Sequence, residues 1–510
     1  MNNWNRRDFL KTAGAGMGIA IGSGMLFSQF VSGCNPKETD APAGGLVFGL
    51  AEEDVKKLLE VALGKGGEFA ELYFEHTITN SVTMAEDIIK ESSERIELGV
   101  GVRVIKGQQQ GYGYTNDINF DSIKSAALTA AAIANSNSNK NIANLERKAL
   151  KRHIYDLNRP LYEMKLNPKI DLIKEAYIAA QNFDSRIQKV TAAMSDSLEK
   201  ITIANSNGLL ISDVRPQTRL FVQVTAVDEK TGVTTSAFAS EGGRMGADVY
   251  SRVKTPTDIG KEAANEAIIL LSAKPAPSGE MPVVLDKDQS GVMIHESVGH
   301  PLEADANWKG QSNMSGRMGE MVAAPIVTIY DDATIPNLRG SLNIDDEGTE
   351  TKKVMLIENG RLTAYMNDLL AAKIMKTEPN GHGRRESYQF MPIPRMNNTI
   401  LAKGDSDPEE IIKSVKKGFY AVSYQGGMVE NTGTFTFSVN LGYMIEDGKL
   451  TYPLKNATLI GSNLKIMQDV DMIGNDTGFF LGTCGKEGQS VPVTCGTPTL
   501  RISKMTVGGN

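Results

Sequence analysis

Two histidines and a glutamate lie within the six residues His295-Glu-Ser-Val-Gly-His300, and these are the residue types that build a hydrolytic zinc site. Only five histidines occur in the 510 residues, so their pairing is informative. On a regular α-helix, residues four apart lie about 40° from each other, whereas residues five apart, as here, lie roughly 140° apart. The sequence therefore predicts either a broken helix at this point or a polar helix end that binds no metal.

The residues around this hexapeptide favour the break. Asp288 and Ser290 are suited to cap a short helix that leads into His295. Gly299 is expected to end that helix in the left-handed region, and Pro301 biases the residue before it away from helical dihedral angles. A π-type bulge would bring the two histidines together equally well.

Two of the three cysteines offer either a third ligand or a disulfide. Cys484 and Cys495 are close in sequence, and such a pair in an exported protein commonly forms a disulfide. Alternatively, the Cys484 thiolate joins His295 and His300 in a three-ligand zinc site with an open fourth position. The residues alone leave both alternatives open.

Residues 1–33 have the pattern of a twin-arginine export signal. The pair Arg6-Arg7 lies near its start, and the 22 residues Thr12–Gly33 carry no charge. An uncleaved membrane helix is the rival interpretation, because this stretch is just long enough to span a bilayer. Five glycines between residues 14 and 24 lower its apolarity and favour the export signal.

The uncharged stretch ends in Val31-Ser-Gly-Cys34, which fits a bacterial lipobox. We therefore expect cleavage before Cys34, a lipid on its thiol, and a mature protein that is periplasmic or anchored to a membrane. Residues 34–49, polar with proline and glycine over much of their length, are expected to form a tether. Twin-arginine export carries folded proteins, which agrees with a metal that is loaded before translocation.

The composition is that of an acidic globular protein. The net charge is −7, and removal of residues 1–33 takes away three basic residues and one acidic residue, which leaves −9. No block rich in lysine or arginine occurs, so we expect no binding to nucleic acid. The remaining chain is long enough for more than one hydrophobic core.

Alternating helix and strand patterns predict an α+β fold in three parts. Residues 50–150 and 151–280 each combine amphipathic helices with strands of alternating apolar residues. Residues 281–510 are rich in glycine turns and β-branched residues, which predicts a β-rich domain that carries the metal site. Lys274–Gly279, with two prolines, is the clearest linker.

Some elements are predicted in detail from apolar spacing and turn residues. They are a helix through Val55–Ala62, a helix from Pro256 to about Ser272, and three hairpins with turns at Asn207-Gly208, Asn359-Gly360 and Asp447-Gly448.

Five motifs together resemble the TldD/PmbA family. Their order is that of the family's metallopeptidase subunit, and the resemblance covers roughly residues 50–508. The partner-type subunit of the family lacks the two-histidine motif, so the chain resembles the catalytic type. The motifs are His295-Glu-Ser-Val-Gly-His300-Pro-Leu-Glu303, Ile344–Thr349, Gly383–Tyr388, Pro394–Met396 and Cys484–Gln489.

The resemblance implies zinc held by His295, His300 and Cys484, with Glu296 as the general base; the sequence does not distinguish zinc from iron. It implies an N-terminal α/β portion and a β-rich metal domain. It further implies hydrolysis of unfolded or flexible peptides, bound in an extended form within the cavity of a homodimer or of a heterodimer with a PmbA-like subunit. The alternative is a non-catalytic peptide-binding or assembly subunit on the same fold.

The chain departs from the family pattern in three places: the export signal with its lipobox, Pro301 where the family suggests glycine, and Cys495, which the family does not lead us to expect. The export signal puts the cytoplasmic substrates and the heteromeric partner of known members in doubt. Cys495 is a competitor for Cys484, because the two thiols could pair.

Other polar residues have an ordinary interpretation beside a functional one. Arg384 and Arg385 are candidates to bind a peptide carboxylate or carbonyl groups, or to form a structural ion pair. Glu303 is either an acceptor for a ligand histidine or a surface carboxylate. His382 lies between two glycines and is expected on a loop surface, and His76 is expected to be structural.

Overall fold

The structure is a computed structural model that describes residues 46–134, 142–155, 160–430 and 432–509. The predicted signal at residues 1–33, Cys34 and the tether as far as residue 45 lie outside these ranges. Val47–Asn510 forms one compact unit. Val47, inside the predicted tether, is buried in a hydrophobic core, so ordered structure begins before residue 50. None of the described helices is long and apolar enough to cross a membrane.

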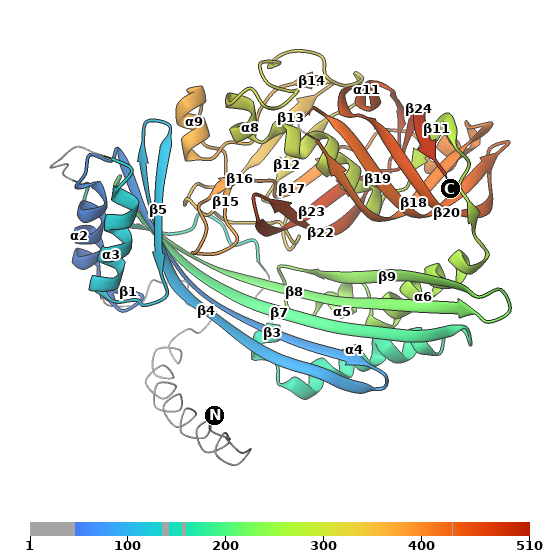
Figure 1. The fold of residues 1–510 in the computed structure, drawn as a ribbon, viewed down its shortest axis with the longest axis horizontal. Helices are drawn as coiled ribbons and strands as arrows, with labels where there is room; N and C mark the ends of the chain where they lie inside the picture. Colours follow the sequence, from blue (N-terminus) through green and yellow to red (C-terminus); the bar gives the residue numbers. More distant parts are fainter. Residues whose placement is uncertain (1–45, 135–141, 156–159, 431, 510) are drawn as a thin grey trace, which may run out of the picture. The chain divides into compact units, whose positions relative to one another are not determined.

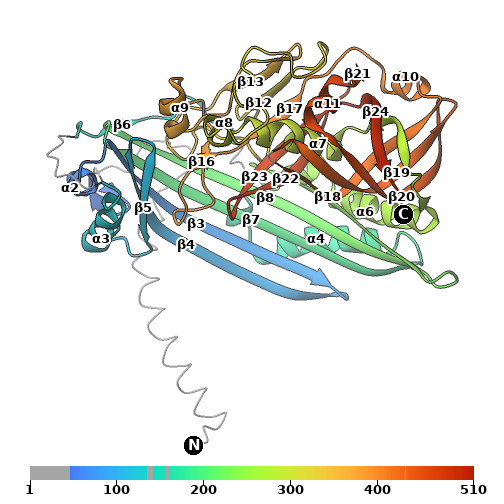
Figure 2. The ribbon, with the colours of Figure 1, turned by 45° about the horizontal axis from the view of Figure 1, so that its top comes forward.

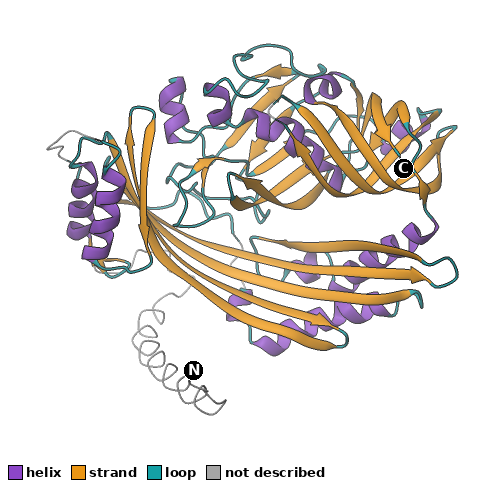
Figure 3. Ribbon diagram, viewed as in Figure 1, coloured by secondary structure: helices purple, strands orange, loops and turns teal. Residues whose placement is uncertain are grey.

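Four long antiparallel strands dominate the N-terminal sheet, which Figures 1 and 3 show as one curved layer. Strand β3 pairs directly with β7, from Glu71 opposite Asn205 to Ala85 opposite Thr191. The sheet is therefore continuous across the boundary predicted near residue 150. In the order of the sheet the strands are β5 (Gln109–Thr115), β4 (Ile88–Lys106), β3 (Phe69–Ala85), β7 (Ile187–Asn205), β8 (Leu209–Asp228) and β6 (Glu146–Lys148), with β9 (Val233–Gly243) also on β8.

Two hydrophobic cores lie on one face of this sheet, because the alternate residues Leu72 and Phe74 of β3 contact the first core and Val82 and Met84 contact the second. Helices cover the two cores at opposite ends of the sheet (Figure 1). The first core has α2 (Glu52–Leu63) and α3 (Phe120–Ala131); the second has α4 (Leu166–Gln181), α5 (Val249–Arg252) and α6 (Pro256–Ser272).

The opposite face of the sheet contacts the C-terminal region through buried charges. Arg103 of β4 pairs with Glu71 of β3 at 2.7 Å and with Glu347 of the C-terminal region at 2.6 Å. All three side chains are fully buried, so these are buried ion pairs in which the arginine charge compensates the carboxylate charges.

The C-terminal region contains a seven-stranded and a six-stranded sheet, which confirms the predicted β-rich part and an α+β fold. In the seven-stranded sheet β20 also pairs with β24, so five of the strands close into a ring (Figure 2). Its order is β10 (Lys274–Pro275), β20 (Lys449–Ser462), β19 (Thr434–Glu446), β18 (Lys417–Val429), β11 (Gly279–Leu285), β24 (Leu500–Gly508) and β21 (Val470–Ile473).

Strands of the six-stranded sheet contact Gly291–Ile294, the helical turn directly before His295. The order of this sheet is β14 (Arg361–Leu362), β13 (Lys353–Glu358), β12 (Ile329–Asp332), β17 (Asn398–Leu401), β23 (Gln489–Thr497) and β22 (Gly478–Lys486). Short helices and a two-stranded ribbon of β15 (Gly383–Arg384) and β16 (Ile393–Pro394) accompany the two sheets. The short helices α8 (Ala304–Trp308) and α9 (Leu369–Met375) contact each other, whereas α10 (Pro408–Lys413) and α11 (Asn463–Gln468) contact β20 and β24 of the seven-stranded sheet.

The elements predicted in detail are confirmed. Val55, Leu58, Leu59 and Ala62 form the buried face of α2, and α6 runs over Pro256–Ser272. The three predicted turns join β7 to β8, β13 to β14 and β19 to β20.

Candidate metal centre

The two histidines lie on a π-helical turn, as one of the sequence alternatives predicts. After α7 (Gly291–Ile294), His295–Gly299 forms the π turn η3, and His300–Leu302 forms the 3-10 turn η4. The backbone N–H of His300 donates to the carbonyl of His295, five residues earlier. This wider turn places two residues that are five apart above one another, where a regular α-helix would not.

The reasons predicted for the break are wrong. Gly299 has φ −59° and His300 has φ −56°, so both stay helical. Glycine at position 299 leaves room for Met396, because a Cβ there would lie 1.9 Å from the Met396 sulfur. Pro301 lies in the first turn of η4, where a missing backbone N–H costs little.

The predicted caps are wrong as well. Neither Asp288 nor Ser290 accepts a capping hydrogen bond, and Asp288 has a left-handed φ of 66°. The Ser290 hydroxyl instead lies 3.1 Å from the Tyr424 hydroxyl, on strand β18. A contact with a distant strand has replaced the local cap.

His295, His300 and Cys484 are brought together by the fold. One possible ligand atom of each lies within 4.8 Å of the others. The Cys484 Sγ is 3.4 Å from His300 Nε2, close to the roughly 3.5 Å between neighbouring ligands that zinc–nitrogen and zinc–sulfur bond lengths give in a tetrahedral site. The two imidazole rings are 5.0 Å apart and nearly perpendicular. The donor set therefore fits zinc.

His295 leaves a donor atom available to a metal. Its Nδ1 is buried and has no hydrogen-bond partner in the described part of the chain. Buried polar atoms in proteins nearly always have a partner, and a bound metal is one way to satisfy such an atom.

The Cys484–Cys495 disulfide is excluded by strand register. Cys484 on β22 is paired with Val491 of β23, whereas Cys495 is paired with Phe480, four residues along β22. At about 3.3 Å per residue the two cysteines are displaced by about 13 Å, well beyond the roughly 7 Å between Cα atoms that a disulfide allows. Both are free, buried thiols, so the structure rules out the disulfide, one of the two alternatives that the sequence left open.

The sulfur of Cys484 is in the form that binds metals. Burial raises the pKa of this thiol, but His295 and His300 outweigh it and bring the pKa down to about 4. Burial lowers the pKa of His300, and Glu303 together with Cys484 raises it to about 10. The metal-free site is therefore a thiolate beside protonated imidazoles, and a metal must displace those imidazole protons.

Glu303 orients His300. Its Oε2 lies 2.9 Å from His300 Nδ1 and 3.1 Å from the Lys486 ammonium. The side chain is nearly fully buried, so the alternative of a surface carboxylate is wrong. Because Nδ1 faces this carboxylate, Nε2 is left facing Cys484, as in a histidine ligand held by an outer partner. Arg395 donates to the backbone carbonyl of Cys484 and so holds the strand that carries this candidate ligand.

Glu296 lies beside the ligands and is reached by solvent. Its Oε2 is 3.9 Å from His300 Nε2, and the side chains of Glu296 and His300 are 18% and 17% exposed. A carboxylate at this position can take a proton from a water at the open side of the site.

Arg384 and Arg385, the two candidates for peptide binding, are both buried. Arg384 donates to the carbonyls of Met396 at 2.6 Å and Pro492 at 2.8 Å. Arg385 forms an ion pair with Glu71 of β3. Arg385 thus follows the alternative of a structural ion pair, and neither side chain lies among the three ligands.

His382 is not on a loop surface, so that prediction is wrong. It is fully buried, with Nε2 3.1 Å from Asp331 and Nδ1 2.8 Å from Asn380. A Cβ on the adjacent Gly383 would lie 2.3 Å from Glu347, which shows that its small neighbour serves close packing. Lys486 and Arg395, which support the site, were missed as functional residues although both lie in the recognised motifs.

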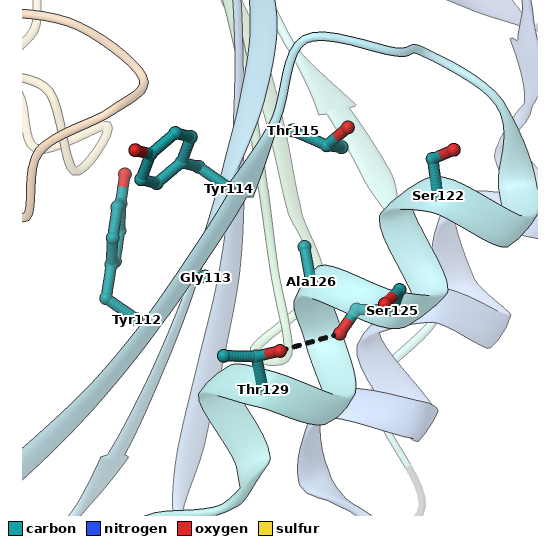
Figure 4. A pocket seen from close by; sticks show the side chains of 8 residues that line it. All are labelled: Tyr112, Gly113, Tyr114, Thr115, Ser122, Ser125, Ala126 and Thr129. Atoms are coloured by element: carbon teal, nitrogen blue, oxygen red, sulfur yellow. Dashed lines mark hydrogen bonds between the residues drawn. The ribbon is translucent and has the colours of Figure 1, made fainter.

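A cavity of about 480 Å³ lies between β5 and α3 and is shown in Figure 4. Hydroxyl groups dominate its lining, among them those of Tyr112, Tyr114 and Ser125, and neither carboxylates, imidazoles nor thiols line it. None of the three candidate metal ligands lines this cavity.

Family comparisons cover most of the chain. The family model described as the PmbA/TldA metallopeptidase C-terminal domain matches residues 278–509. The central-domain model matches residues 159–271, and the model of domain 1 matches residues 70–134. The chain belongs to the PmbA/TldD metallopeptidase family.

Members of the PmbA/TldD family with similar sequences are named metalloproteases. The metalloprotease TldD homolog of Haemophilus influenzae is 40% identical over 475 residues, which are 90% of this chain and 97% of that protein. The metalloprotease TldD homolog of Buchnera aphidicola from Acyrthosiphon pisum is 39% identical over 90% of this chain and 96% of its own length. The zinc metalloprotease TldD homolog of Saccharolobus solfataricus is 27% identical, over 89% and 99%.

Solved structures share the fold of this PmbA/TldD family member. A putative modulator of DNA gyrase from Thermotoga maritima aligns with a TM-score of 0.73 at 23% identity, over 90% of this chain and 100% of that one. TldE from Thermococcus kodakarensis aligns with a TM-score of 0.71 at 20% identity, over 89% and 100%.

Proposed function

We propose that the chain is a zinc-dependent peptidase of the HExxxH type that hydrolyses unfolded or flexible peptides. The observation that carries this proposal is the convergence of His295, His300 and Cys484 within 4.8 Å, with Glu296 at the solvent-reached side. The names of the relatives, metalloprotease and zinc metalloprotease, support the reaction class and the metal.

In this proposal Glu296, Glu303 and Arg395 each have a separate role. When bound, zinc supplies Lewis acidity, which acidifies water and polarises a carbonyl. Glu296 takes a proton from water and delivers it to the leaving amine. Glu303 fixes the ring of His300, and Arg395 fixes the strand that carries Cys484.

The experiment is to measure bound metal and cleavage of an unstructured peptide on the same purified sample. We expect close to one zinc per chain, cleavage that stops on chelation, and recovery when zinc is returned. Peptide binding without cleavage in the zinc-loaded protein would overturn the peptidase proposal in favour of a non-catalytic peptide-binding subunit. Recovery with ferrous iron but not with zinc would overturn the choice of metal.

We further propose that the mature protein acts outside the cytoplasm, anchored by a lipid at Cys34. The support is the Arg6-Arg7 pair and the lipobox that ends at Cys34. Mass spectrometry of the mature N-terminus should find a lipid-modified Cys34, and Cys34→Ala should leave the protein in the soluble extract. An unprocessed N-terminus would contradict the anchor.

We propose a dimer as the working form, either of two copies or with a PmbA-like subunit. The similarity of the fold to TldE supports an assembly of this kind. Light scattering on the purified chain would give twice the chain mass for a homodimer; a monomer that becomes active only with a second subunit would indicate the heterodimer.

A further inference from the structure

A second polar cavity, of about 230 Å³, lies between the helix-free face of the N-terminal sheet and the C-terminal region. Thr77, Ser197 and Gln217, from β3, β7 and β8, line one side, and Pro492 of β23 lines the other. None of the three proposed metal ligands lines it.

The cavity is on the other side of the β22–β23 hairpin from the metal ligands. Pro492 pairs with Thr483, the next rung of the ladder after Cys484 and Val491. Neighbouring residues of a strand point to opposite faces, so Pro492 faces away from the side to which Cys484 points. The cavity is therefore a separate site.

Three arginines make one end of the cavity positive: Arg244, Arg339 and Arg384. Within the described residues none of them forms an ion pair with a carboxylate. Arg339 donates to the carbonyl of Gly482 at 3.0 Å, and Arg384 donates only to carbonyls. Burial lowers the pKa of Arg339 to about 9 and that of Arg384 to about 10; neighbouring arginines lower both further, while Asp346, which lines the same cavity, opposes the shift at Arg384.

Arg244 is the least satisfied of the three. It is 3% exposed and stacks over the Tyr155 ring, and its Nε has no hydrogen-bond partner among the described residues. A buried guanidinium without a carboxylate is costly, and an anion in the cavity would compensate it.

Carboxyl groups line the other end of the cavity, where one of them, Glu199, also lies 3.5 Å from the guanidinium of Arg215. Glu97 on β4 and Glu199 on β7 are both paired across the strands with Thr77 of β3, so they flank it in one row. Glu75, two residues away on β3, is 2% exposed and has no lysine or arginine partner among the described residues. Burial and the neighbouring Glu199 raise the pKa of Glu75 to about 8, so near neutral pH this carboxyl ionises fully only when a cation lies beside it.

Gln217, which also lines the cavity, has a side-chain amide without hydrogen-bond partners among the described residues. Both its Oε1 and its Nε2 are buried and lack hydrogen-bond partners in the described chain. A peptide group offers one donor and one acceptor, which is the complement of this amide.

We propose that this cavity binds a small zwitterion of the amino-acid or dipeptide class, with its carboxylate at Arg244, Arg339 and Arg384 and its ammonium at the carboxylates of β3 and β7. The volume lies below the roughly 300–1,000 Å³ of sites for drug-sized ligands, so a ligand of this size fits. A multivalent anion such as phosphate is disfavoured, because the same cavity holds Glu75 and Glu199. The site does not depend on peptidase activity, since it shares no residue with the metal ligands.

Calorimetric titration of the full chain carrying Glu296→Ala, which prevents turnover of the probes, tests the proposal. The probes are glycine, glycylglycine, glycylglycine amide, N-acetylglycylglycine and inorganic phosphate. We expect glycine or glycylglycine to bind, and loss of either terminal charge from glycylglycine to weaken binding roughly 10- to 100-fold, because each end removes a charge-assisted hydrogen bond. Phosphate binding as tightly as glycylglycine, or no binding by any zwitterion, would overturn the proposal.

Two variants locate the ligand. Arg244→Gln should weaken glycylglycine at least about ten-fold. Gln217→Leu removes two unpartnered atoms and breaks no side-chain hydrogen bond, so it should weaken binding while the melting temperature stays the same or rises. Gln223→Leu, an exposed glutamine on the same strand, is the matched control and should bind like the parent. Unchanged binding in both cavity variants would place the ligand elsewhere and overturn the assignment.

Discussion

His300 Nδ1 lies 2.9 Å from Oε2 of Glu303, in a position where the carboxylate is almost fully buried. Lys486 forms an ion pair with the same carboxylate, and its ammonium lies 3.1 Å from the same oxygen. Because the ring is held from its Nδ1 side, the carboxylate sets which nitrogen faces Cys484. In the proposed zinc site, Glu303 is therefore a residue that positions His300 rather than a ligand itself.

Glu303→Gln should lower zinc affinity about 10- to 100-fold, because the amide keeps the shape of the carboxylate but not its charge. Competition with a zinc chelator measures this. Lys413→Gln, which removes the charge of an exposed ion pair, is the control and should leave the affinity unchanged. Full affinity in Glu303→Gln would mean that the carboxylate serves only the fold.

Acid should destabilise the metal-free protein through the same carboxylate. Burial raises the pKa of Glu303, but Lys486 and His300 lower it to about 2. The stabilisation is present above the unfolded value of about 4.3 and is lost as the pH falls toward 2. Urea unfolding between these pH values should show a steep loss of stability that is smaller in Glu303→Gln. Parallel curves for the two proteins would contradict this.

Zinc affinity should rise with pH around neutrality. The pKa of His300 in the metal-free site is about 10, so zinc must displace its proton, whereas Cys484, with a pKa of about 4, is already a thiolate. Each displaced proton contributes about a ten-fold gain in apparent affinity per pH unit. Chelator competition at several pH values between about 6 and 8 checks the slope, and an affinity independent of pH would refute the assignment of His300.

Glu296→Ala should lose at least about 10²- to 10⁴-fold in peptide hydrolysis while its zinc content stays near that of the parent. The carboxylate is 18% exposed beside His300, and no other carboxylate is placed to replace it in the described site. Peptide turnover and metal analysis on one preparation measure both quantities. Loss of zinc from this variant would instead make Glu296 a ligand or a structural residue.

The two cysteines form a matched pair for testing the third ligand. Cys484→Ser should lower zinc content sharply, because a serine hydroxyl is a far weaker ligand than a thiolate. Cys495→Ser changes an equally buried thiol that lies outside the three-ligand cluster but close enough to His295 to raise its pKa, so it should lower zinc content far less than Cys484→Ser. Metal analysis of both variants decides the matter; equal zinc content in the two would contradict the ligand role of Cys484.

The convergence of the two histidines was predictable from the sequence, because His295 and His300 lie within one hexapeptide and only a local π turn was needed to bring them together. What could not be predicted depends on distant segments. His382 is buried because Asp331, far away in sequence, accepts from its ring. The continuous N-terminal sheet likewise depends on the pairing of β3 with β7, which local periodicity does not encode.

Gly299 illustrates the same limit, since its residue type was predicted to matter for a backbone reason that the structure does not support. Its φ is −59°, and the real constraint is the Met396 sulfur 1.9 Å from the position of a Cβ. Gly299→Ala should therefore destabilise the protein by about 1–3 kcal/mol through overpacking. Denaturant unfolding measures this change.

Met396→Ala supplies the control, because it makes room for the new methyl group. In the double variant Gly299→Ala with Met396→Ala, the loss should be smaller than the sum of the two single losses, since the clash is the interaction between them. If glycine were instead required for its backbone freedom, the two losses would simply add. The sign of this coupling distinguishes a steric role of Gly299, which keeps the π turn in place beneath His300, from a conformational one.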